Sequence, residues 1–411
     1  MRWGFLGTDG SWAIEPSFEA VGPFSEGLAA AKEGAWGYID RERATVVPFE
    51  LAYAAAFHRG MANAAKPNAV GSFIDRSGRA LPYDERIGLP AHPELIGVTG
   101  YREKWDGIRS AKRSGVLAAD SLEERLPVRF AKVTDLGPAF LAAIDDTHDP
   151  KTVLFDADVQ PVAELPIQWT SAYGCGAYLV FDVFEPGRRS SELAAYDADT
   201  FERVATYEDS RHMHMGYDPE SDTYSLLRQR QRRRLDDALQ PTDEVLPTVF
   251  ESFRVTPVKS GKRTRIEIDG EPIGVEVDKT HRAGAEDATT IWAMVKTGKA
   301  KRWGLLGVDG WIVEPEHELF EREGPYWRVG ALGSEGLVDA DGRWLLEPVH
   351  TRVRHCGEHG HAFYEGGKAF KNGNLKGGAW RVTRPDGSPL CQQTFADVGE
   401  WREDRLAAAL D

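Results

Sequence analysis

Cysteine is scarce in this sequence of 411 residues, which holds only Cys175, Cys356 and Cys391, far apart from one another. An odd number of widely spaced cysteines cannot form the dense disulfide framework of a small secreted scaffold. No stretch approaches the roughly 20 apolar residues that cross a bilayer, and the opening MRWGFLGTDG has no basic segment followed by an apolar one. We therefore expect a cytoplasmic protein that does not engage a membrane.

Positive charge is also in deficit, with 50 Lys and Arg against 65 Asp and Glu, a net charge of −15. A negative field repels phosphate backbones, so nucleic acid is not expected as a partner, whereas a basic protein is favoured. The sequence has no phosphate-binding glycine loop, no nucleophile elbow and no HExxH motif. We therefore expect no enzyme, no cofactor, and no catalytic, cofactor-binding or metal-binding residues, although distant loops could still assemble a site.

Turn-forming residues and tryptophan are abundant, with 42 Gly, 23 Pro and 12 Trp. The segment 3–16, WGFLGTDGSWAIEP, recurs at 303–315 as WGLLGVDGWIVEP and again at 335–348, and weaker copies start near residues 36, 72 and 380. In each copy a short apolar run meets an Asp-Gly or similar pair, and a second apolar run ends at proline. This pattern predicts a β-hairpin, because such pairs readily adopt positive φ and proline cannot donate to a sheet ladder.

Downstream of each hairpin lies a turn such as Gly22-Pro23-Phe24 and then a small-residue strand such as 27–32, GLAAAK. Each unit is therefore predicted to be a three- or four-stranded meander, in which the next tryptophan fills the space beside the alanines. This pattern resembles the bacterial WG-repeat family, closely over 1–82 and 301–411 and faintly between them. The resemblance implies a β-rich repeat with binding or scaffold roles and implies no single activity.

The two chain ends look like halves of one module. Leu28 precedes Trp36 by 8 residues, and Leu406 would precede Trp3 by 8 residues if the ends were joined. We therefore predict an all-β fold of tandem meanders, closed into a propeller-like ring by pairing of strand 405–410 with 2–6; an open curved stack is the alternative. The predicted divisions are 1–82 (WG repeats), 83–300 (degenerate repeats) and 301–411 (WG repeats), with about eleven module starts against the usual four to eight blades.

Four segments carry side chains that could do chemistry. Residues 355–361, HCGEHGH, offer metal ligands, with His359 and His361 on one face if the segment is a strand, but the two glycines favour a loop with solvated histidines. Residues 211–215, RHMHM, could bind a metal or sense pH, but their alternation of histidine and methionine favours a strand with a polar outer face. Residues 228–234, RQRQRRR, could meet an acidic partner or nucleic acid but are predicted to be a solvated edge strand. Residues 145–150, DDTHDP, combine carboxylates and an imidazole as acid–base chemistry needs, but they are more typical of a hairpin loop.

The favoured function is a non-enzymatic, protein-binding repeat scaffold, because repeats present extended surfaces. A specific version is a cytoplasmic immunity protein whose negative charge steers it to a basic toxin. The alternative is binding of a small molecule or carbohydrate by exposed aromatic rings, which would require convergence of several of Trp12, Trp105, Trp169, Trp311, Trp327, Trp344 and Trp401.

Overall fold

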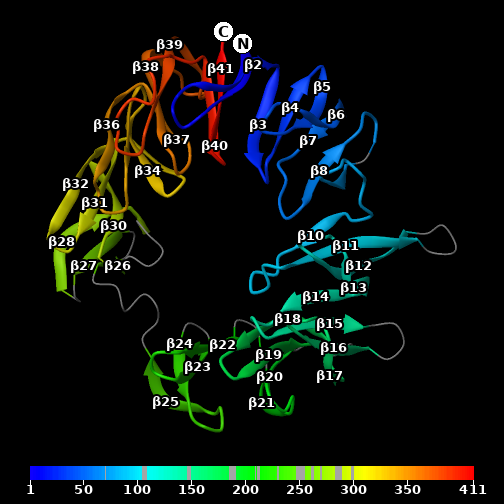
Figure 1. Ribbon diagram of the computed structural model, residues 1–411. Helices are drawn as coiled ribbons and strands as arrows, with labels where there is room; N and C mark the ends of the chain where they lie inside the picture. Colours follow the sequence, from blue (N-terminus) through cyan, green and yellow to red (C-terminus); the bar gives the residue numbers. More distant parts are fainter. Residues whose placement is uncertain are drawn as a thin grey trace. The chain divides into compact units, whose positions relative to one another are not determined.

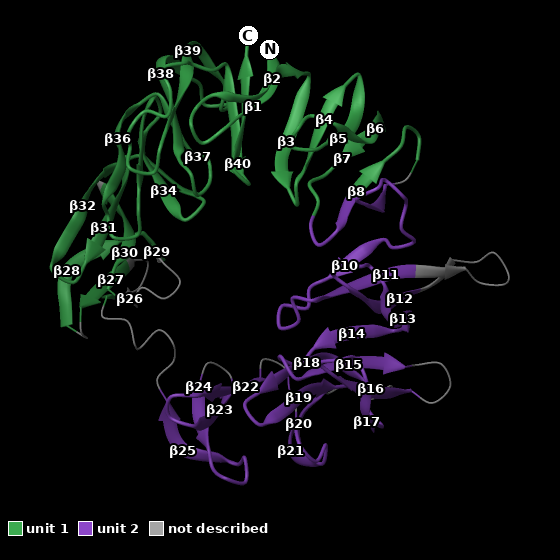
Figure 2. Cartoon of the chain, in the orientation of Figure 1, with its two compact units in different colours: residues 1–57, 63–70, 249–411 green, residues 58–62, 71–248 purple. Residues whose placement is uncertain are grey.

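The computed structural model describes residues 1–69, 71–103, 109–145, 150–184, 191–208, 210, 213–228, 231–246, 255–260, 263–268, 271–282, 289–297 and 300–411. These residues form eleven antiparallel sheets of three or four strands, which confirms the all-β fold of tandem meanders. The chain divides into two compact units (Figure 2), unit 1 with residues 1–57, 63–70 and 249–411 and unit 2 with residues 58–62 and 71–248. We number the sheets as modules 1 to 11, starting from the one that contains the N-terminus.

Unit 1 contains six complete modules, most of whose strands are labelled in Figure 1. Module 1 is β40 (Asp397–Arg402), β41 (Arg405–Leu410), β1 (Arg2–Leu6) and β2 (Trp12–Phe18), and module 2 is β3 (Ala20–Ser25), β4 (Leu28–Glu33), β5 (Ala35–Ile39) and β6 (Thr45–Leu51). Module 8 is β26 (Val255–Ser260), β27 (Arg263–Ile268) and β28 (Glu271–Val277), and module 9 is β29 (Lys279–Arg282), β30 (Ile291–Thr297), β31 (Ala300–Gly307) and β32 (Gly310–His317). Module 10 is β33 (Leu319–Glu323), β34 (Tyr326–Ala331), β35 (Ser334–Val338) and β36 (Trp344–His350), and module 11 is β37 (Arg352–His355), β38 (His361–Ala369) and β39 (Leu375–Thr383).

Unit 2 contains four complete modules. Module 4 is β10 (Glu85–Ile87), β11 (Leu95–Glu103), β12 (Arg109–Ala118) and β13 (Glu124–Phe130), and module 5 is β14 (Lys132–Asp135), β15 (Phe140–Asp145), β16 (Lys151–Asp156) and β17 (Pro161–Leu165). Module 6 is β18 (Trp169–Cys175), β19 (Tyr178–Val183), β20 (Glu192–Asp197) and β21 (Arg203–Glu208), and module 7 is β22 (Met213–Asp218), β23 (Thr223–Arg228), β24 (Gln231–Leu235) and β25 (Pro241–Leu246). Module 3, formed by β7 (Tyr53–Ala54), β8 (Met61–Ala65) and β9 (Ser72–Asp75), contains residues assigned to both units.

The N- and C-terminal strands lie in one module, which confirms the predicted pairing of residues 405–410 with residues 2–6. Strand β41 pairs antiparallel with β1 from Arg2 opposite Leu410 to Leu6 opposite Leu406, and the two chain ends lie side by side in Figure 1. The chain ends thus supply the two middle strands of a four-stranded sheet, so that neither is an open edge. The closed ring, the open stack and the divisions at residues 82 and 300 stay predictions.

We call the last strand of each module, in the order given above, its outer strand. The glycine of the Trp-Gly pair lies opposite an irregularity in the neighbouring outer strand. In module 9, Trp303 pairs with His317 but Leu305 pairs with Val313, so β32 carries extra residues opposite Gly304. A Cβ at Gly304 would lie 2.6 Å from the Val313 carbonyl oxygen, closer than real contacts allow. The corresponding distances at four other glycines are 2.4 to 2.7 Å, at Gly4, Gly37, Gly115 and Gly336. The glycine is therefore kept for a close backbone approach at a bulge.

This close approach explains which degenerate modules lose the glycine. Module 4 has no Trp-Gly pair, yet it keeps both Gly115 and the register shift opposite it. In modules 5 and 6 the corresponding positions are Val153 and Ala194, and the ladder there is regular. In modules 4 to 6 the glycine and the bulge are therefore kept or lost together, whereas module 11 has Arg381 in the glycine's place although Trp380 lies opposite Phe395 and Thr383 opposite Pro389.

The core is a series of apolar layers between successive sheets. Between modules 1 and 2, Phe5 and Phe24 pack edge to face at 4.7 Å, and Trp3 packs against a cluster that includes Ala29, Ala31 and Ala407. This confirms the predicted pairing of large rings with small side chains. The tryptophans of the Trp-Gly pairs are only partly buried, so they are not the fully buried side chains for which the largest losses on truncation are expected.

Candidate binding site

Three hairpin tips of unit 1 meet around one hollow. They are the turns that join the first and second strands of module 10 (β33–β34), module 11 (β37–β38) and module 1 (β40–β41). Gly324 lies against the His355 ring, where an added Cβ would come 2.5 Å from the ring carbon Cδ2. Gly357 lies against Trp401, whose backbone N–H donates to the Cys356 carbonyl oxygen. Small residues in these turns thus let successive tips touch.

The module 1 tip is fixed on its far side by module 2. The Glu403 carboxylate accepts hydrogen bonds from the backbone N–H groups of Glu26 and of Gly27, the latter at 2.9 Å, and forms an ion pair with Arg41 at 3.2 Å. Glu403 and Asp404 both have positive φ, 48° and 63°, as the central residues of a tight hairpin require. Since non-glycine residues rarely adopt this conformation, the Glu403 contacts offset a local backbone cost.

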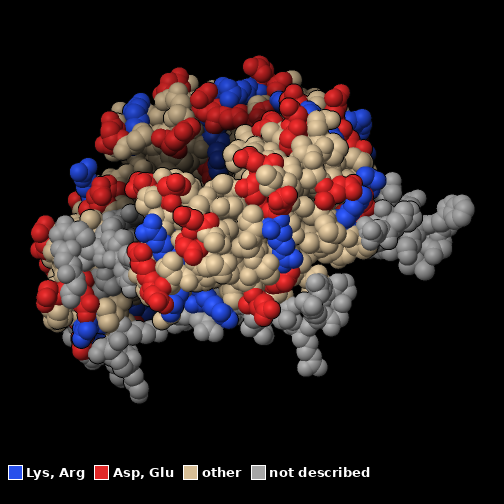
Figure 3. All heavy atoms as spheres, turned by 90° about the horizontal axis from the view of Figure 1, so that it is seen from below, with Lys and Arg blue, Asp and Glu red and all other residues tan. Residues whose placement is uncertain are grey.

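The hollow between these tips has a volume of about 620 Å³ and an acidic wall. Four glutamates line it together with one arginine: Glu323, Glu358, Glu400, Glu403 and Arg402. Glu403 is committed to the contacts above, and Glu400 forms an exposed ion pair with Arg402 at 3.2 Å. Elsewhere the charges are mixed, and Figure 3 shows acidic and basic side chains interspersed over one face of the molecule. The concentration of carboxylates makes this hollow suited to a cationic group.

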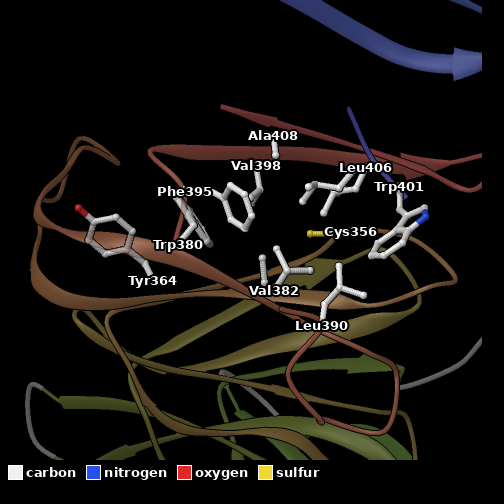
Figure 4. Close-up of a cluster of buried hydrophobic side chains, with 12 residues drawn as sticks. Cys356, Tyr364, Trp380, Val382, Leu390, Phe395, Val398, Trp401, Leu406 and Ala408 are labelled. Atoms are coloured by element: carbon white, nitrogen blue, oxygen red, sulfur yellow. The ribbon is translucent and has the colours of Figure 1, made fainter. Parts of the chain in front are cut away.

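The floor of the hollow belongs to the apolar layer between modules 11 and 1 (Figure 4). Cys356 and Trp401 are 1% and 2% exposed and pack among Leu406, Val382 and Leu390. Burial raises the pKa of the Cys356 thiol to about 12, so it is neither a thiolate ligand nor a nucleophile at neutral pH. The floor therefore offers packing rather than chemistry.

The histidines of residues 355–361 lie on a hairpin that contains the loop favoured by the sequence. Residues 356–360 form a loop, as the two glycines indicated, so His359 and His361 do not share a strand. His355 instead lies opposite His361 across the hairpin, with their Nδ1 atoms 3.3 Å apart. His361 is 2% exposed, so the expectation that these histidines are all solvated was wrong for it. Among the described residues, no three His, Cys, Asp or Glu side chains gather as a metal site would require.

The buried histidine predicts a pH-dependent stability. Burial, and then the neighbouring His355, lower the pKa of His361 from 6.5 to about 4. The unfolded chain takes up a proton on this histidine below pH 6.5, whereas the folded chain does so only below about pH 4. The contribution of neutral His361 to the free energy of unfolding is therefore complete above pH 6.5 and is lost as the pH falls from 6.5 to about 4. We expect His361 to account for a loss of about 2 kcal/mol by pH 5, measured as the difference between the wild-type protein and His361→Gln in urea unfolding between pH 8 and pH 5. His361→Gln should flatten this dependence, and an unchanged slope in that variant would contradict the assignment.

Two other segments chosen from sequence are described only in part, and their described residues make structural contacts. Residues 211 and 212 lie outside the described residues; of the remainder, His214 is exposed and stacks on Tyr173 at 4.6 Å, while Met215 is fully buried. This agrees with a polar outer face over an apolar inner one. Residues 146–149 also lie outside the described part, and Asp145 ends β15 with an ion pair to Arg129 at 3.7 Å.

The basic run does not form an edge strand, contrary to expectation. Strand β24 lies between β23 and β25, because a further strand follows it along the chain. Its arginines have local partners: Arg232 donates to the Ser225 hydroxyl at 2.8 Å, Arg233 approaches Asp243 at 3.7 Å and Arg234 approaches Glu244 at 3.5 Å. Residues 229 and 230 lie outside the described residues.

Those of the tryptophans named for ring stacking that the structure describes do not form a platform. Trp169, Trp327 and Trp401 are 4%, 6% and 2% exposed, so their faces are covered by protein. Trp12, Trp311 and Trp344 each pack against a different apolar cluster, and Trp105 lies outside the described residues. The sequence analysis did not identify Glu323 and Glu400. Both lie beside the turn between the first and second strands of a module, and aligning these turns between modules could have revealed them.

Comparison with known proteins identifies part of the chain. Residues 3–35 and 36–66 each match the family of WG-containing repeats, which confirms the resemblance seen in the sequence. Curated proteins give no match. The part of the chain that the structure describes has no helix long and apolar enough to cross a membrane.

Several solved structures match the chain at low similarity. They include a eukaryotic initiation factor (10% identity, TM-score 0.36, 93% of this chain and 98% of that chain) and the β-propeller domain of the trilobed protease from Pyrococcus furiosus, described as having an open velcro topology (9%, 0.30, 76% and 98%). BamB from Moraxella catarrhalis is a third (11%, 0.29, 65% and 89%).

Proposed function

We propose that this WG-repeat protein is a non-enzymatic scaffold whose acidic hollow binds a positively charged segment of a protein partner. The observation that carries the proposal is the convergence of four glutamates from three hairpin tips around one hollow of about 620 Å³. The net charge of −15 supports it, since a negative field accelerates encounter with a basic partner.

The specific form of the proposal is a cytoplasmic immunity protein that neutralises a basic toxin. The charge and the repeat architecture motivate it, because such an inhibitor must reach its target quickly and cover a broad surface. The test is affinity capture of partners with the full chain, followed by co-expression with any captured toxin domain. Rescue of the cells supports the immunity role, whereas capture of basic proteins without any rescue leaves only the general scaffold.

The hollow itself is tested with an oligo-arginine peptide. We expect the double variant Glu358→Lys/Glu400→Lys to bind this peptide at least about ten-fold more weakly, because two carboxylates facing the cation become like charges. Isothermal titration calorimetry at two salt concentrations measures the loss.

The matched control is Glu15→Lys/Glu347→Lys, which changes two exposed glutamates of the outer strands β2 and β36 and alters the net charge equally. An equal loss in this control would show that the total charge, and not the hollow, attracts the peptide.

A further inference from the structure

Most outer strands of the modules contain a proline, which hinders the addition of a further strand at the edge of the sheet. An outer strand exposes unpaired N–H and C=O groups, and proline blunts such an edge because it has no N–H. Eight of the eleven outer strands contain a proline: β2, β6, β13, β17, β25, β28, β32 and β36, at Pro16, Pro48, Pro127, Pro161, Pro241, Pro272, Pro315 and Pro348. The pattern extends across both WG modules and degenerate ones.

Two of the remaining outer strands are covered by their own chain. In module 3 the N–H of Leu81 donates to the Phe73 carbonyl oxygen at 2.7 Å, so the segment after β9 pairs with it. In module 11 the N–H groups of Trp380 and Phe395 each donate to the other's carbonyl oxygen at 2.9 Å, which covers β39. The exception is β21 in module 6, with the sequence RVATYE. Among the described residues, β21 has no proline and pairs only with β20.

A hollow lies on each side of β21. The first, of about 680 Å³, lies between modules 5 and 6 and is lined by Ile167, Val183, Phe184 and other apolar groups, with Arg203 of β21 at its wall. Arg203 forms an ion pair there with Glu192. The apolar lining suits an aliphatic or aromatic side chain.

The second hollow, of about 570 Å³, lies between modules 6 and 7 and includes Tyr207 of β21. Its apolar wall is Met213 and Leu226, and its charged groups are Arg228 and Arg233 against Glu208. Arg233 also approaches the exposed Asp243, which does not line the hollow, at 3.7 Å, whereas no ion pair holds Arg228 among the described residues. Within the lining itself, two guanidinium groups against one carboxylate favour an acidic side chain. Because side chains of a strand alternate between faces, a strand added to β21 would direct alternate residues toward the two hollows.

We propose that the free edge of β21 binds an extended segment of a partner protein in which apolar and acidic residues alternate. Main-chain hydrogen bonds to β21 supply affinity, and the two hollows select the alternating side chains. This surface lies in unit 2 and is separate from the acidic hollow of unit 1, so either proposal can fail without the other.

The probe is a blocked peptide of alternating valine and glutamate, titrated into the full chain by calorimetry. Methylating the amide nitrogens on one edge of the peptide should weaken binding by at least about ten-fold, the loss expected for a main-chain hydrogen bond. Hydrogen exchange at residues 203–208 should slow when the unmethylated peptide binds. Equal affinity of the methylated peptide, or equally tight binding of a valine–lysine peptide, would overturn the proposal.

Variants locate the site and separate it from self-association. Val204, 45% exposed on β21, becomes glutamate in Val204→Glu, and Val162, 41% exposed on the proline-bearing β17, provides the control Val162→Glu. We expect about ten-fold weaker binding in the first, because a carboxylate on the edge repels the acidic segment, and no change in the second, with Arg228→Glu also weakening binding by removing charge complementarity. Equal losses in the two valine variants, or a dimer that Val204→Glu dissociates in gel filtration, would overturn it.

Discussion

Trp401→Ala is expected to lower the free energy of unfolding by about 3 to 5 kcal/mol, the usual cost of truncating a fully buried tryptophan. Trp401 is 2% exposed and lies in the apolar layer between modules 11 and 1, beside Cys356 and Leu406 (Figure 4). Removing the indole opens a cavity directly beneath the acidic hollow, at the sheet shared by the two chain ends. Urea unfolding followed by circular dichroism measures the loss.

Two further substitutions show whether the indole acts by its volume. Among the described residues, the Trp401 indole Nε1 is buried with no hydrogen-bond partner, so Trp401→Phe removes an unsatisfied donor while keeping most of the ring. We expect Trp401→Phe to cost less than about 1.5 kcal/mol, because the lost contacts are partly offset. Trp36→Ala, at a partly buried Trp-Gly position, should cost less than Trp401→Ala. A reversal of that order would contradict the burial argument.

The fold was predictable because each module repeats the same local rules. Turn residues, small-residue strands and proline-terminated strands recur along the chain, and their spacing at the two ends predicted the pairing that joins Leu6 to Leu406. These are features of neighbouring residues or of a repeat period, which one sequence contains. The edge assignment of residues 228–234 failed because whether a strand is interior depends on the strand that follows it.

The candidate site was less predictable, because its members come from different modules. Glu323, Glu358 and Glu400 belong to three separate turns. Only Glu358 lies in a segment that the sequence singled out, and nothing near Glu323 or Glu400 distinguishes them from other surface glutamates. The histidine pair depended on hairpin register: a loop of five residues places His355 opposite His361, whereas a continuous strand would have grouped His359 with His361. Degree of burial was similarly hidden, since a tryptophan in a repeat motif and one between motifs look alike in sequence.

Gly304→Val is expected to destabilise the protein by about 3 kcal/mol, the upper range for forcing atoms into a packed site. A Cβ there would lie 2.6 Å from the Val313 carbonyl oxygen and 2.8 Å from the Pro315 nitrogen, and both are backbone atoms that cannot rotate away. Relief requires the bulge in β32 to move, which would disturb its pairing with β31. Urea unfolding of the full chain measures the loss.

The matched control is Gly88→Val, where an added Cβ meets no atom within 4 Å, and it should change stability by less than about 0.5 kcal/mol. Module 5 already provides the natural counterpart, since Val153 occupies the position of Gly304 on a regular ladder. If the bulge is the reason for the glycine, valine should destabilise a module only where a bulge lies opposite it, and not where the ladder is regular. Equal, small effects of Gly304→Val and Gly88→Val would show that the bulge yields easily, and the joint loss of glycine and bulge in modules 5 and 6 would then need another cause.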